Sequence, residues 1–371
     1  MYAMNSIAAE CGGSRAAARS GKTRVAVIFG ECSPEHEVSL QSAAAVMENL
    51  DPGEFEAVPV GITKDGRWLR YEGGPERIAD GSWTEGPCRP ARVTPDRGAG
   101  LLADEPVDLA FPVLHGRNGE DGTVQGLLEL SGVPAVGCGT LATAICMDKD
   151  RAHRLVRLAG VEVPRGRTFR RREMPSDGRE AEEVLRAAAE EFALHAGGQP
   201  ELFVKPLRAG SSFGITKVRG AEALPAAVRA AFEYDDEVIV EEAVPGFEVG
   251  CAVMDGPDGP FCGRVDEIEL ADGFFDFREK YTLETSKIHC PARIDELTEK
   301  RVQKCAKVIW KALGCSGLAR VDMFLTPAGR IVFNEVNTIP GFTTHSRYPN
   351  MMKAAGLSFT EMLTRLMRQY L

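Results

Sequence analysis

The segment Gly317–Gly341, GLARVDMFLTPAGRIVFNEVNTIPG, constrains the fold more strongly than any other stretch of this chain. Two apolar runs flank Pro327-Ala328-Gly329, and this pattern predicts a β-hairpin with a tight turn. We expect Ala328-Gly329 to form a two-residue loop, which fixes how the two strands face each other. Because side chains alternate between the two faces of a strand, the polar residues of each strand then share one face.

Four polar side chains meet on that face. The expected register places Asp322 opposite Glu335 and Arg320 opposite Asn337, with Cα atoms roughly 5 Å apart. Two facing carboxylates destabilise a sheet unless a cation lies between them, and oxygen ligands suit Mg²⁺. An exposed hairpin whose acids face water is the alternative. The guanidinium among the acids, and the Pro340-Gly341 strand end where a backbone N–H can approach a ligand, favour the metal site.

The size and charge of the chain limit the possible functions. With 371 residues it is too long for one hydrophobic core, so we expect two or three domains. With 44% hydrophobic and 26% charged residues it has the composition of an ordinary globular protein. A net charge of −10 argues against a nucleic-acid partner and a membrane-binding basic patch, and no apolar run approaches the roughly 18 residues of a membrane span.

The ten cysteines are scattered without a C-x-x-C pair. In a chain of this size, that spacing favours reduced, mostly buried thiols in a cytoplasmic protein over a disulfide framework or a zinc site. Residues 1–23 are rich in Ala, Ser, Gly and Arg and lack an apolar run. We therefore expect a disordered extension there rather than a signal peptide.

The first ordered unit, residues 24–141, has the pattern of an open parallel α/β sheet. A buried strand runs into a helix with Ser33 as the expected N-cap and Pro34 in the first turn. Residues 71–105 show little periodicity, which suggests a surface insertion. His115 follows the third strand in a glycine-rich loop, at a strand end where ligands gather in such sheets, although a loop histidine without function is the alternative. Strands are expected over 24–30, 55–62 and 107–114.

The middle unit, residues 142–236, combines a long helix over 141–158 with two strands. The Gly/Ser loop 208–214 between these strands offers backbone N–H groups and hydroxyls to phosphate oxygens. It lacks the G-K-[ST] sequence of a Walker A loop, and most such loops are simple turns. Lys205, an inward-facing lysine on an apolar strand, favours a phosphate nearby.

The last unit, residues 237–371, contains the hairpin. Residues 274–288 are aromatic and charged without clear periodicity, which suggests a mobile lid that shields a reactive intermediate from water. An amphipathic helix over 296–313 leads into the hairpin, and a final helix over 358–371 ends the chain.

Six motifs carry a resemblance to a known family: EHEVSL (35–40), LHGRNGEDGTVQG (114–126), MDKDRAH (147–153), FVKPLRAGSSFGITKV (203–218), RVDMF (320–324) and NEVNTIPGFT (334–343). Together they resemble the D-alanine–D-alanine ligases, and the resemblance covers about 24–371. It implies a three-domain α/β ATP-grasp fold with ATP clamped between the central and C-terminal sheets. It also implies an enzyme that joins two D-amino acids for peptidoglycan, and a homodimer.

The resemblance implies a role for each matching residue of the reaction centre. Glu35 would hold the ammonium group of the first D-alanine, and Ser211 would orient Glu35 and Tyr281. Arg320 and the N–H of Gly341 would stabilise the tetrahedral intermediate, since a single oxyanion donor is worth on the order of 3 kcal/mol. ATP would first convert D-alanine into an acyl phosphate, which the amine of the second substrate attacks.

The resemblance also implies how the nucleotide and metal are bound. Lysines would contact the phosphates, and two glutamates would contact the adenine side and the ribose. Asp322, Glu335 and Asn337 would hold two Mg²⁺ ions, with Mn²⁺ as a possible substitute. The nucleotide-binding residues implied in this way are Lys149, Lys205, Ser212, Glu241, Glu248 and Lys280.

The second substrate depends on a few positions. His115 would contact substrate, and Ser346 would hold the second substrate's carboxylate. Housekeeping members typically have Tyr at Phe275 and an aliphatic residue at Arg347, whereas this chain resembles the D-alanine–D-serine ligases of glycopeptide resistance, VanG type. Losing the tyrosine hydroxyl makes room, and a guanidinium can donate to a serine hydroxyl. Lys280-Tyr281 argues against D-lactate-making members, in which a His replaces that Tyr.

Two alternatives stay open at this point. Arg347 can instead pair with a neighbouring acid, in which case D-alanine is the second substrate. The chain can also be an idle ATP-grasp protein that only binds nucleotide, although the implied metal ligands and Arg320 are all present.

Overall fold

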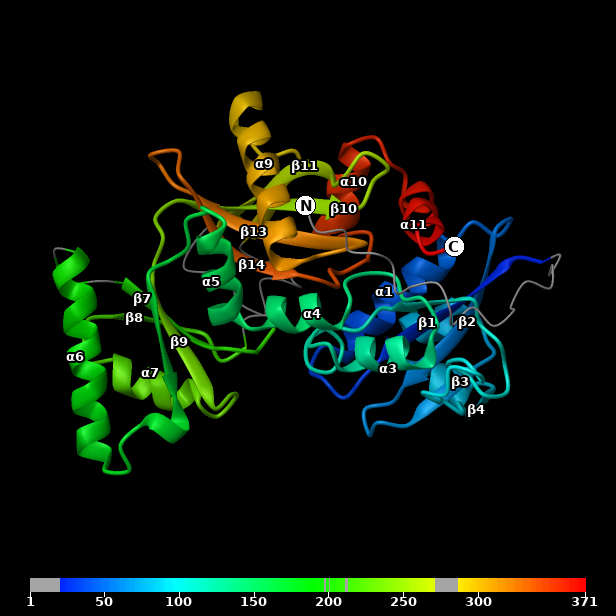
Figure 1. Ribbon diagram of the computed structural model, residues 1–371, viewed down its shortest axis with the longest axis horizontal. Helices are drawn as coiled ribbons and strands as arrows, with labels where there is room; N and C mark the ends of the chain where they lie inside the picture. The colour runs from blue at the N-terminus through cyan, green and yellow to red at the C-terminus, as the bar shows by residue number, and fades with distance from the viewer. Residues whose placement is uncertain (1–20, 197, 200, 211–212, 271–285) are drawn as a thin grey trace, which may run out of the picture.

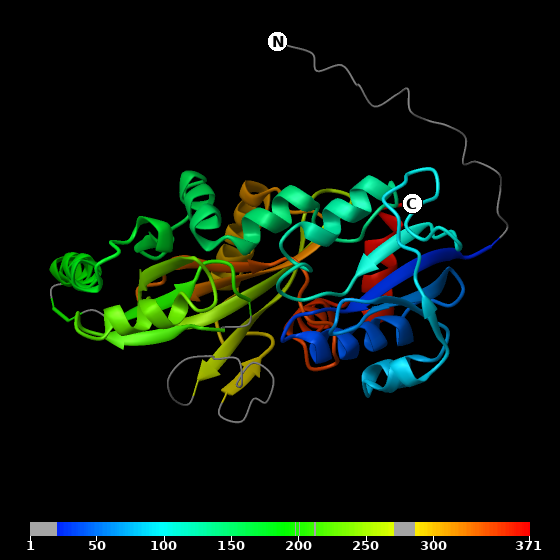
Figure 2. The same cartoon turned by 90° about the horizontal axis from the view of Figure 1, so that it is seen from below.

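The computed structural model describes residues 21–196, 198–199, 201–210, 213–270 and 286–371. Three sheets follow one another along an elongated molecule (Figures 1 and 2). No helix in these residues is long and apolar enough to cross a membrane, and the nine cysteines described there are all free. Most of the predicted extension 1–23 and five predicted site residues lie outside the described residues: Ser211, Ser212, Phe275, Lys280 and Tyr281.

The N-terminal sheet has the strand order β4-β3-β2-β1-β5. The central strand β1 pairs in parallel with β2 and β5, as an open α/β sheet predicts. β3 and β4 add to the edge in antiparallel pairing, so the sheet is mixed and not wholly parallel. Its elements are β1 (Thr23–Gly30), α1 (His36–Glu48), β2 (Phe55–Ile62), β3 (Trp68–Tyr71), α2 (Pro75–Ala79), η1 (Ser82–Glu85), β4 (Cys88–Pro90), β5 (Leu109–Pro112) and α3 (Thr123–Ser131).

The prediction of a surface insertion over residues 71–105 is wrong. This segment supplies β4 and buried core side chains, among them Ile78, Trp83 and Leu101. The Trp83 ring packs edge-on against Phe29 of β1, with ring centroids 5.1 Å apart. The segment lacks a regular period because short turns separate its apolar residues, and only tertiary packing brings them together.

Two predicted helix boundaries also differ. Helix α1 begins at His36 rather than just after Ser33, whose hydroxyl accepts the N–H of Glu35 in the turn before it. The expected helix over 141–158 is broken at Asp148, which separates α4 (Thr140–Met147) from α5 (Lys149–Leu158). Asp148 has an extended backbone and caps α5 by accepting the N–H of Arg151, a common helix-start pattern.

The central sheet is antiparallel and has the order β6-β9-β7-β8. Helices α6 and α7 pack on it through apolar side chains such as Phe192 and Val228. Because β9 pairs with β6 and β7, the predicted boundary at 236/237 cuts through this sheet, and we propose that the central unit extends to Glu242. Its elements are β6 (Gly166–Arg170), η2 (Arg171–Glu173), α6 (Gly178–Ala196), β7 (Glu201–Pro206), β8 (Thr216–Arg219), α7 (Leu224–Ala231) and β9 (Glu237–Glu242).

The C-terminal sheet has the order β12-β11-β10-β13-β14 and is also antiparallel. Its core includes side chains of α9 and also of α4 and α5, although the sequence placed most of the latter two helices in the middle unit. Val156 of α5 and Val302 of α9 are both fully buried there. The elements are β10 (Phe247–Met254), β11 (Phe261–Leu270), β12 (Ser286–His289), α9 (Glu296–Leu313), β13 (Leu318–Leu325) and β14 (Ile331–Asn337).

The last two helices, α10 (Arg347–Ala354) and α11 (Phe359–Arg368), join the C-terminal unit to the N-terminal one. Both views show α11 beside α1 and β1 (Figures 1 and 2). The ring of Phe342, just before α10, packs edge-on against Phe111 of β5 with centroids 5.5 Å apart. One apolar core therefore crosses the two units and fixes the strand end after β14 against the N-terminal sheet.

Candidate active site

The β13–β14 hairpin has the predicted register at its polar end. Arg320 pairs with Asn337 and Asp322 with Glu335 across the two antiparallel strands. The prediction that these four side chains meet at one place is therefore confirmed. The residue pairing follows from the alternation of apolar and polar side chains, because a slip of one residue would turn the polar set into the core.

The turn of the hairpin differs from the predicted two-residue loop. The N–H of Thr326 donates to the carbonyl oxygen of Arg330 at 2.9 Å, which leaves Pro327-Ala328-Gly329 as a three-residue loop. Nearer the site, the register shifts by one residue at Asn334, which forms a β-bulge. The extra loop residue and the bulge offset each other, so the predicted pairs form despite the wrong loop.

Asp322 is buried and surrounded by positive charge. Arg320 donates to both of its carboxylate oxygens, with Nε–Oδ1 at 2.9 Å and Nη2–Oδ2 at 2.7 Å. The side-chain amide of Asn337 donates to Oδ2 at 2.9 Å, and Nη1 of Arg347 lies 3.4 Å from Oδ1. Burial acts against the charge of Arg320, but the Asp322 carboxylate outweighs it and raises the pKa of the guanidinium above its usual value.

Arg347 lies on α10 and is buried beside β10 and β11. Its Nε and Nη2 form a two-bond ion pair with Asp266 at 2.7 and 2.8 Å. Its Nη1 donates to Glu248 at 2.7 Å. The alternative left open by the sequence, in which Arg347 pairs with a neighbouring acid, therefore matches the contacts that Arg347 makes. Burial disfavours the charged guanidinium, but the facing carboxylates of Asp266 and Asp322 raise its pKa well above the usual value.

Asp266 is a site residue that sequence reasoning missed. It is fully buried on β11, where its Oδ1 also accepts the N–H of Gly250 at 3.0 Å. A signal was present, because the strand RVDEIEL repeats around Asp266 the RVD pattern that surrounds Asp322. A buried acid on a strand needs a cationic partner, and the sequence does not say which cation that is.

Two of the lysines predicted for the nucleotide, Lys149 and Lys205, are buried near this hairpin. Lys149 opens α5, donates to the carbonyl of Ala209 at 3.1 Å and lies 3.8 Å from Glu335. Lys205 on β7 pairs with the buried Glu241 on β9 at 2.7 Å. The structure thus brings both lysines next to acids between the central and C-terminal sheets.

His153 on α5 is a second residue that sequence reasoning passed over, although it lies in the MDKDRAH motif. Its Nδ1 is 3.3 Å from Glu241 and its Nε2 is 2.9 Å from the carbonyl of Asn334 in the bulge. Burial would raise the pKa of Glu241, but the charges of Lys205 and His153 outweigh it and lower that pKa. Glu241 therefore stays ionised at neutral pH.

The predicted residues of the N-terminal unit lie where that unit meets the other two. Glu35 is buried, and a Cβ added at Gly116 would lie 2.2 Å from its Oε2. The φ of 73° at Gly116 favours glycine there. A Cβ at Gly210 would lie 3.3 Å from the same oxygen, which places the Gly/Ser loop beside Glu35. His115 is buried and its Nδ1 lies 2.9 Å from the carbonyl of Ile339. Burial lowers the pKa of His115 to about 4, so its imidazole is neutral.

Two further glutamates, Glu31 and Glu120, lie near Glu35 and His115, and the sequence did not single out either of them. We call the region of these four residues the N-terminal corner. Glu120 accepts the N–H groups of Gly116 and Ile339, both at 3.0 Å. Burial and the charge of Glu35 raise the pKa of Glu120 to about 7. Glu31 follows β1, and burial raises its pKa to about 9. Both acids could be found only from the packing of loops that are distant in sequence.

The backbone and side chains that follow β14, from Gly341 to Ser346, are closely packed. Ser346 accepts the N–H of Thr343 at 3.0 Å, and a Cβ added at Gly341 would lie only 2.7 Å from its Oγ. Glycine at 341 thus lets the backbone come close to the hydroxyl. Ser346 and Gly341, both predicted site residues, are neighbours in the structure.

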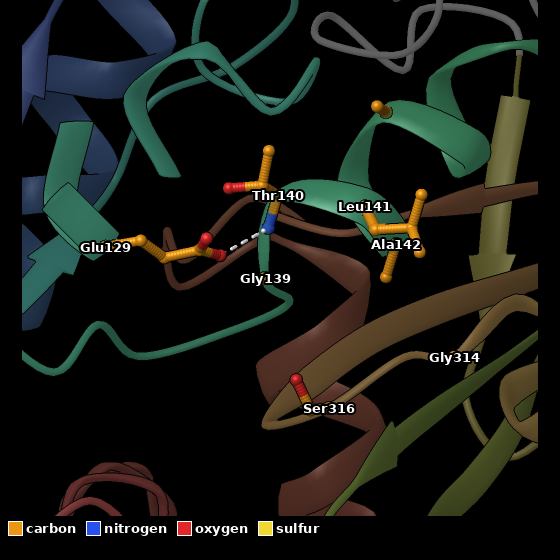
Figure 3. Close-up of a pocket in the computed structure, with 8 residues that line it drawn as sticks. Glu129, Gly139, Thr140, Leu141, Ala142, Gly314 and Ser316 are labelled. Atoms are coloured by element: carbon orange, nitrogen blue, oxygen red, sulfur yellow. Dashed lines mark hydrogen bonds between the residues drawn. The ribbon is translucent and has the colours of Figure 1, made fainter. Parts of the chain in front are cut away.

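Of two cavities in the described part of the molecule, one is lined in part by a predicted site residue and the other is not. The first, of about 540 Å³, is lined by Asp266, Cys290, His345 and Arg347, and it adjoins the predicted second-substrate position. The second, of about 500 Å³, lies between α3, α4 and the end of α9, where Glu129 accepts the N–H of Thr140 at 2.9 Å (Figure 3). It contains none of the predicted site residues, so the first cavity is the one that belongs to the site.

Two family models match most of this chain. Residues 24–138 match the family model "D-ala D-ala ligase N-terminus", and residues 155–368 match "D-ala D-ala ligase C-terminus". The chain belongs to the D-alanine–D-alanine ligase family. It is therefore an ATP-dependent ligase with an ATP-grasp fold that forms a peptide bond, and its family uses a divalent metal.

The names of individual relatives differ, and together they do not give one second substrate. The vancomycin/teicoplanin A-type resistance protein VanA of Enterococcus faecium is 41% identical over 93% of this chain and 97% of its own length. The D-alanine–D-alanine ligase of Mycolicibacterium vanbaalenii is 42% identical over 94% of this chain and 96% of its own length. The crystal structure of VanG D-Ala:D-Ser ligase from Enterococcus faecalis superposes with a TM-score of 0.83 and 55% identity, covering 95% of this chain and 100% of that one.

Proposed function

We propose that this ligase joins D-alanine to D-serine, for peptidoglycan precursors that give vancomycin resistance. The observation that carries the proposal is a guanidinium, Arg347, fixed by Asp266 at the wall of the cavity next to Ser346. A fixed polar group selects a substrate that bears a matching hydroxyl, because the analogue without it leaves that group unpaired. The 55% identity to a D-Ala:D-Ser ligase supports the same choice.

The hairpin residues fit a divalent cation. Asp322, Glu335 and Asn337 supply two carboxylates and an amide from adjacent strands, a set of oxygen donors that suits Mg²⁺. The guanidiniums around Asp322 show that positive charge is stable at this position. In the proposed mechanism these three residues would hold two Mg²⁺ ions, and ATP would supply the phosphoryl group that activates the first carboxylate.

The chain's own residues then have separate tasks. Glu35, beside the Gly/Ser loop, holds the ammonium group of D-alanine, and Ser211 and Tyr281 orient it. Arg320 and the N–H of Gly341 face the oxygen on which negative charge develops, as in other acyl transfers. Ser346 binds the carboxylate of the second substrate, and the predicted lid excludes water from the activated acid.

Nucleotide binding is part of the same proposal. Lys149 and Lys205 are buried and placed between the two sheets, where each can exchange its present acid for a phosphate oxygen. Lys280 and Ser212 complete the phosphate contacts, and Glu241 and Glu248 contact the adenine side and the ribose. Glu248 also holds Arg347, so the proposed nucleotide and second-substrate positions share one ion-pair network.

A housekeeping D-alanine–D-alanine ligase is the second candidate. The ion pairs of Arg347 favour it, because a guanidinium that already contacts Asp266, Glu248 and Asp322 has less capacity to bind a substrate hydroxyl. The two candidates share every residue of the first-substrate and metal positions. They differ only at the second substrate.

The deciding experiment measures ATP-dependent phosphate release with D-alanine alone, with D-alanine plus D-serine, and with D-alanine plus D-lactate, and identifies each product by mass spectrometry. We expect turnover to depend on D-serine and to yield the mixed dipeptide. Equal turnover with D-alanine alone would establish the housekeeping activity. Turnover with no pair would show a protein that binds nucleotide without catalysis.

A variant series locates the selectivity. Phe275→Tyr with Arg347→Leu is expected to restore a D-alanine preference, as measured by kcat/KM for each second substrate. Since Arg347→Leu leaves Asp266 buried and unpaired, the series includes Asp266→Asn to remove that charge. If the combined variant still prefers D-serine, the account of this pocket is wrong. The predicted homodimer is a separate proposal, which sedimentation of the purified protein can test.

A further inference from the structure

Glu31, directly after β1, has a backbone conformation that is costly for a residue with a side chain. Its φ is 117°, and the other described non-glycine residue with positive φ is Asn118. Its N–H donates to the carbonyl of Ile62 at 2.9 Å, and its carbonyl lies 2.7 Å from Nδ1 of His36. Such a conformation is unfavourable for a residue with a side chain and persists only where the surroundings hold it, often at functional sites.

The side chain of Glu31 is also in an unfavourable environment, because its carboxyl group is buried. It is 2% exposed, and its Oε1 accepts the N–H of His115 at 2.9 Å. Its Oε2 is buried and makes no hydrogen bond of good geometry within the part of the chain that the structure describes. The Ser33 hydroxyl lies close enough to lower its pKa slightly, yet burial dominates and raises that pKa to about 9. A buried oxygen without a partner indicates a binding partner that comes from elsewhere.

A second acceptor in the same corner lacks a partner. Nδ1 of the neutral His115 donates to the carbonyl of Ile339, so its Nε2 carries a lone pair. This Nε2 is also buried without a hydrogen bond among the described residues. Together with the carboxylate of Glu35, whose charge acts on Glu31, the corner gathers three acceptors from two loops, the one between β1 and α1 and the one after β5. A primary ammonium group offers three N–H donors and one positive charge.

We propose that Glu31 supplies a second acidic acceptor, beside Glu35, for the ammonium group of the first substrate. Glu31 also accepts the backbone N–H of His115, and this contact positions the His115 imidazole to accept the third N–H of the ammonium group. The inference rests on the proposed function only in that a D-amino acid is the first substrate. It applies whether the second substrate is D-serine or D-alanine.

The charges around Glu31 make this binding depend on pH. Glu35 on the turn before α1 and Glu120 on the loop after β5 both disfavour a further negative charge, and Arg320 on β13 acts on Glu120 and His115. Glu31 is therefore protonated in the free site and ionises when an ammonium group arrives. Binding releases a proton, so the affinity for the first substrate rises with pH below the pKa of Glu31.

The test uses Glu31→Gln, which keeps the oxygen that accepts the His115 N–H, and Glu31→Gly, which relieves the backbone. Asn118→Gly is the matched control, because it is exposed and shares the positive φ. Steady-state kinetics at saturating ATP and second substrate give kcat and KM for D-alanine between about pH 6.5 and 8.5. We expect about a tenfold higher KM for D-alanine in both Glu31 variants, with kcat changed less than about threefold.

The pH profile separates binding from a structural role. In the wild-type protein, kcat/KM for D-alanine should rise with pH by up to about tenfold per unit, and both Glu31 variants should lose this rise. An unchanged KM and pH profile in both variants, with or without a shift in melting temperature, would overturn the proposal. If the wild type turns over D-alanine alone, the D-serine assignment fails, while the same KM and pH measurements still decide the role of Glu31.

Discussion

Two regions of this protein collect acidic side chains, and they stabilise them in opposite ways. At the β13–β14 hairpin, the buried Asp322 is in contact with the guanidiniums of Arg320 and Arg347. In the N-terminal corner, Glu31 and Glu120 form no ion pair with a described residue, and burial with a neighbouring acid raises their pKa values to about 9 and about 7. At the hairpin, the charges of arginines balance the charges of the acids. In the N-terminal corner, protonation removes the charge of the acids.

The difference matches the two kinds of ligand that we propose. A region whose acids are paired with arginines can exchange those contacts for a metal ion, because carboxylate oxygens are ligands that such an ion prefers. A region whose acids are protonated can charge only when a cation enters, so it responds to an ammonium group and to pH. Three predictions test this contrast.

The largest effect is expected on folding. Arg347→Leu removes the partner of Asp266, which is 0% exposed, and leaves that charge buried in the sheet. Breaking a buried pair from one side costs about 3–5 kcal/mol of the free energy of unfolding. Urea unfolding followed by circular dichroism measures it.

Arg330→Leu is the matched control, since Arg330 pairs with Glu162 at 2.9 Å on the surface. We expect that variant to change stability by less than about 1 kcal/mol. A similarly small loss for Arg347→Leu would mean that the buried Asp266 does not depend on its ion pair with Arg347.

The second effect is on catalysis. Glu335→Gln keeps the shape of the proposed metal ligand and removes its charge, so dipeptide synthesis should fall by about a thousandfold while the protein stays folded. Phosphate release measures the rate, and circular dichroism checks the fold. Glu162→Gln, on the surface near β14, should keep the wild-type rate. Full activity of Glu335→Gln would refute the metal site.

The smallest effect concerns Glu31 and folding. Its pKa in the folded protein, about 9, is above its ordinary value of 4.5, so the folded state binds more protons between these values. The stabilising contribution is complete below the ordinary pKa and is lost as pH rises towards the folded one. Relative to wild type, Glu31→Gln should therefore gain about 1 kcal/mol of unfolding free energy per pH unit between about pH 6 and 8. A difference that does not change with pH would show that Glu31 is ionised.

The sequence predicted the hairpin face well because that face depends on local alternation. Asp322 and Glu335 pair as expected even though the loop has three residues, since the bulge at Asn334 restores the register. Residues 71–105 carry no comparable signal, because their buried Trp83 belongs to a core made by distant strands.

The sequence by itself determined the order of the units, the polar face of the hairpin and the motifs that place the chain in its family. Tertiary structure alone decided that Arg347 pairs with Asp266, 81 residues away, and that Glu31 turns its carboxyl towards His115. The physical reason is that a strand's period tells which face a side chain occupies, whereas the partner on that face comes from another loop or strand. Whether a buried side chain is charged therefore depends on a partner that is distant in the sequence.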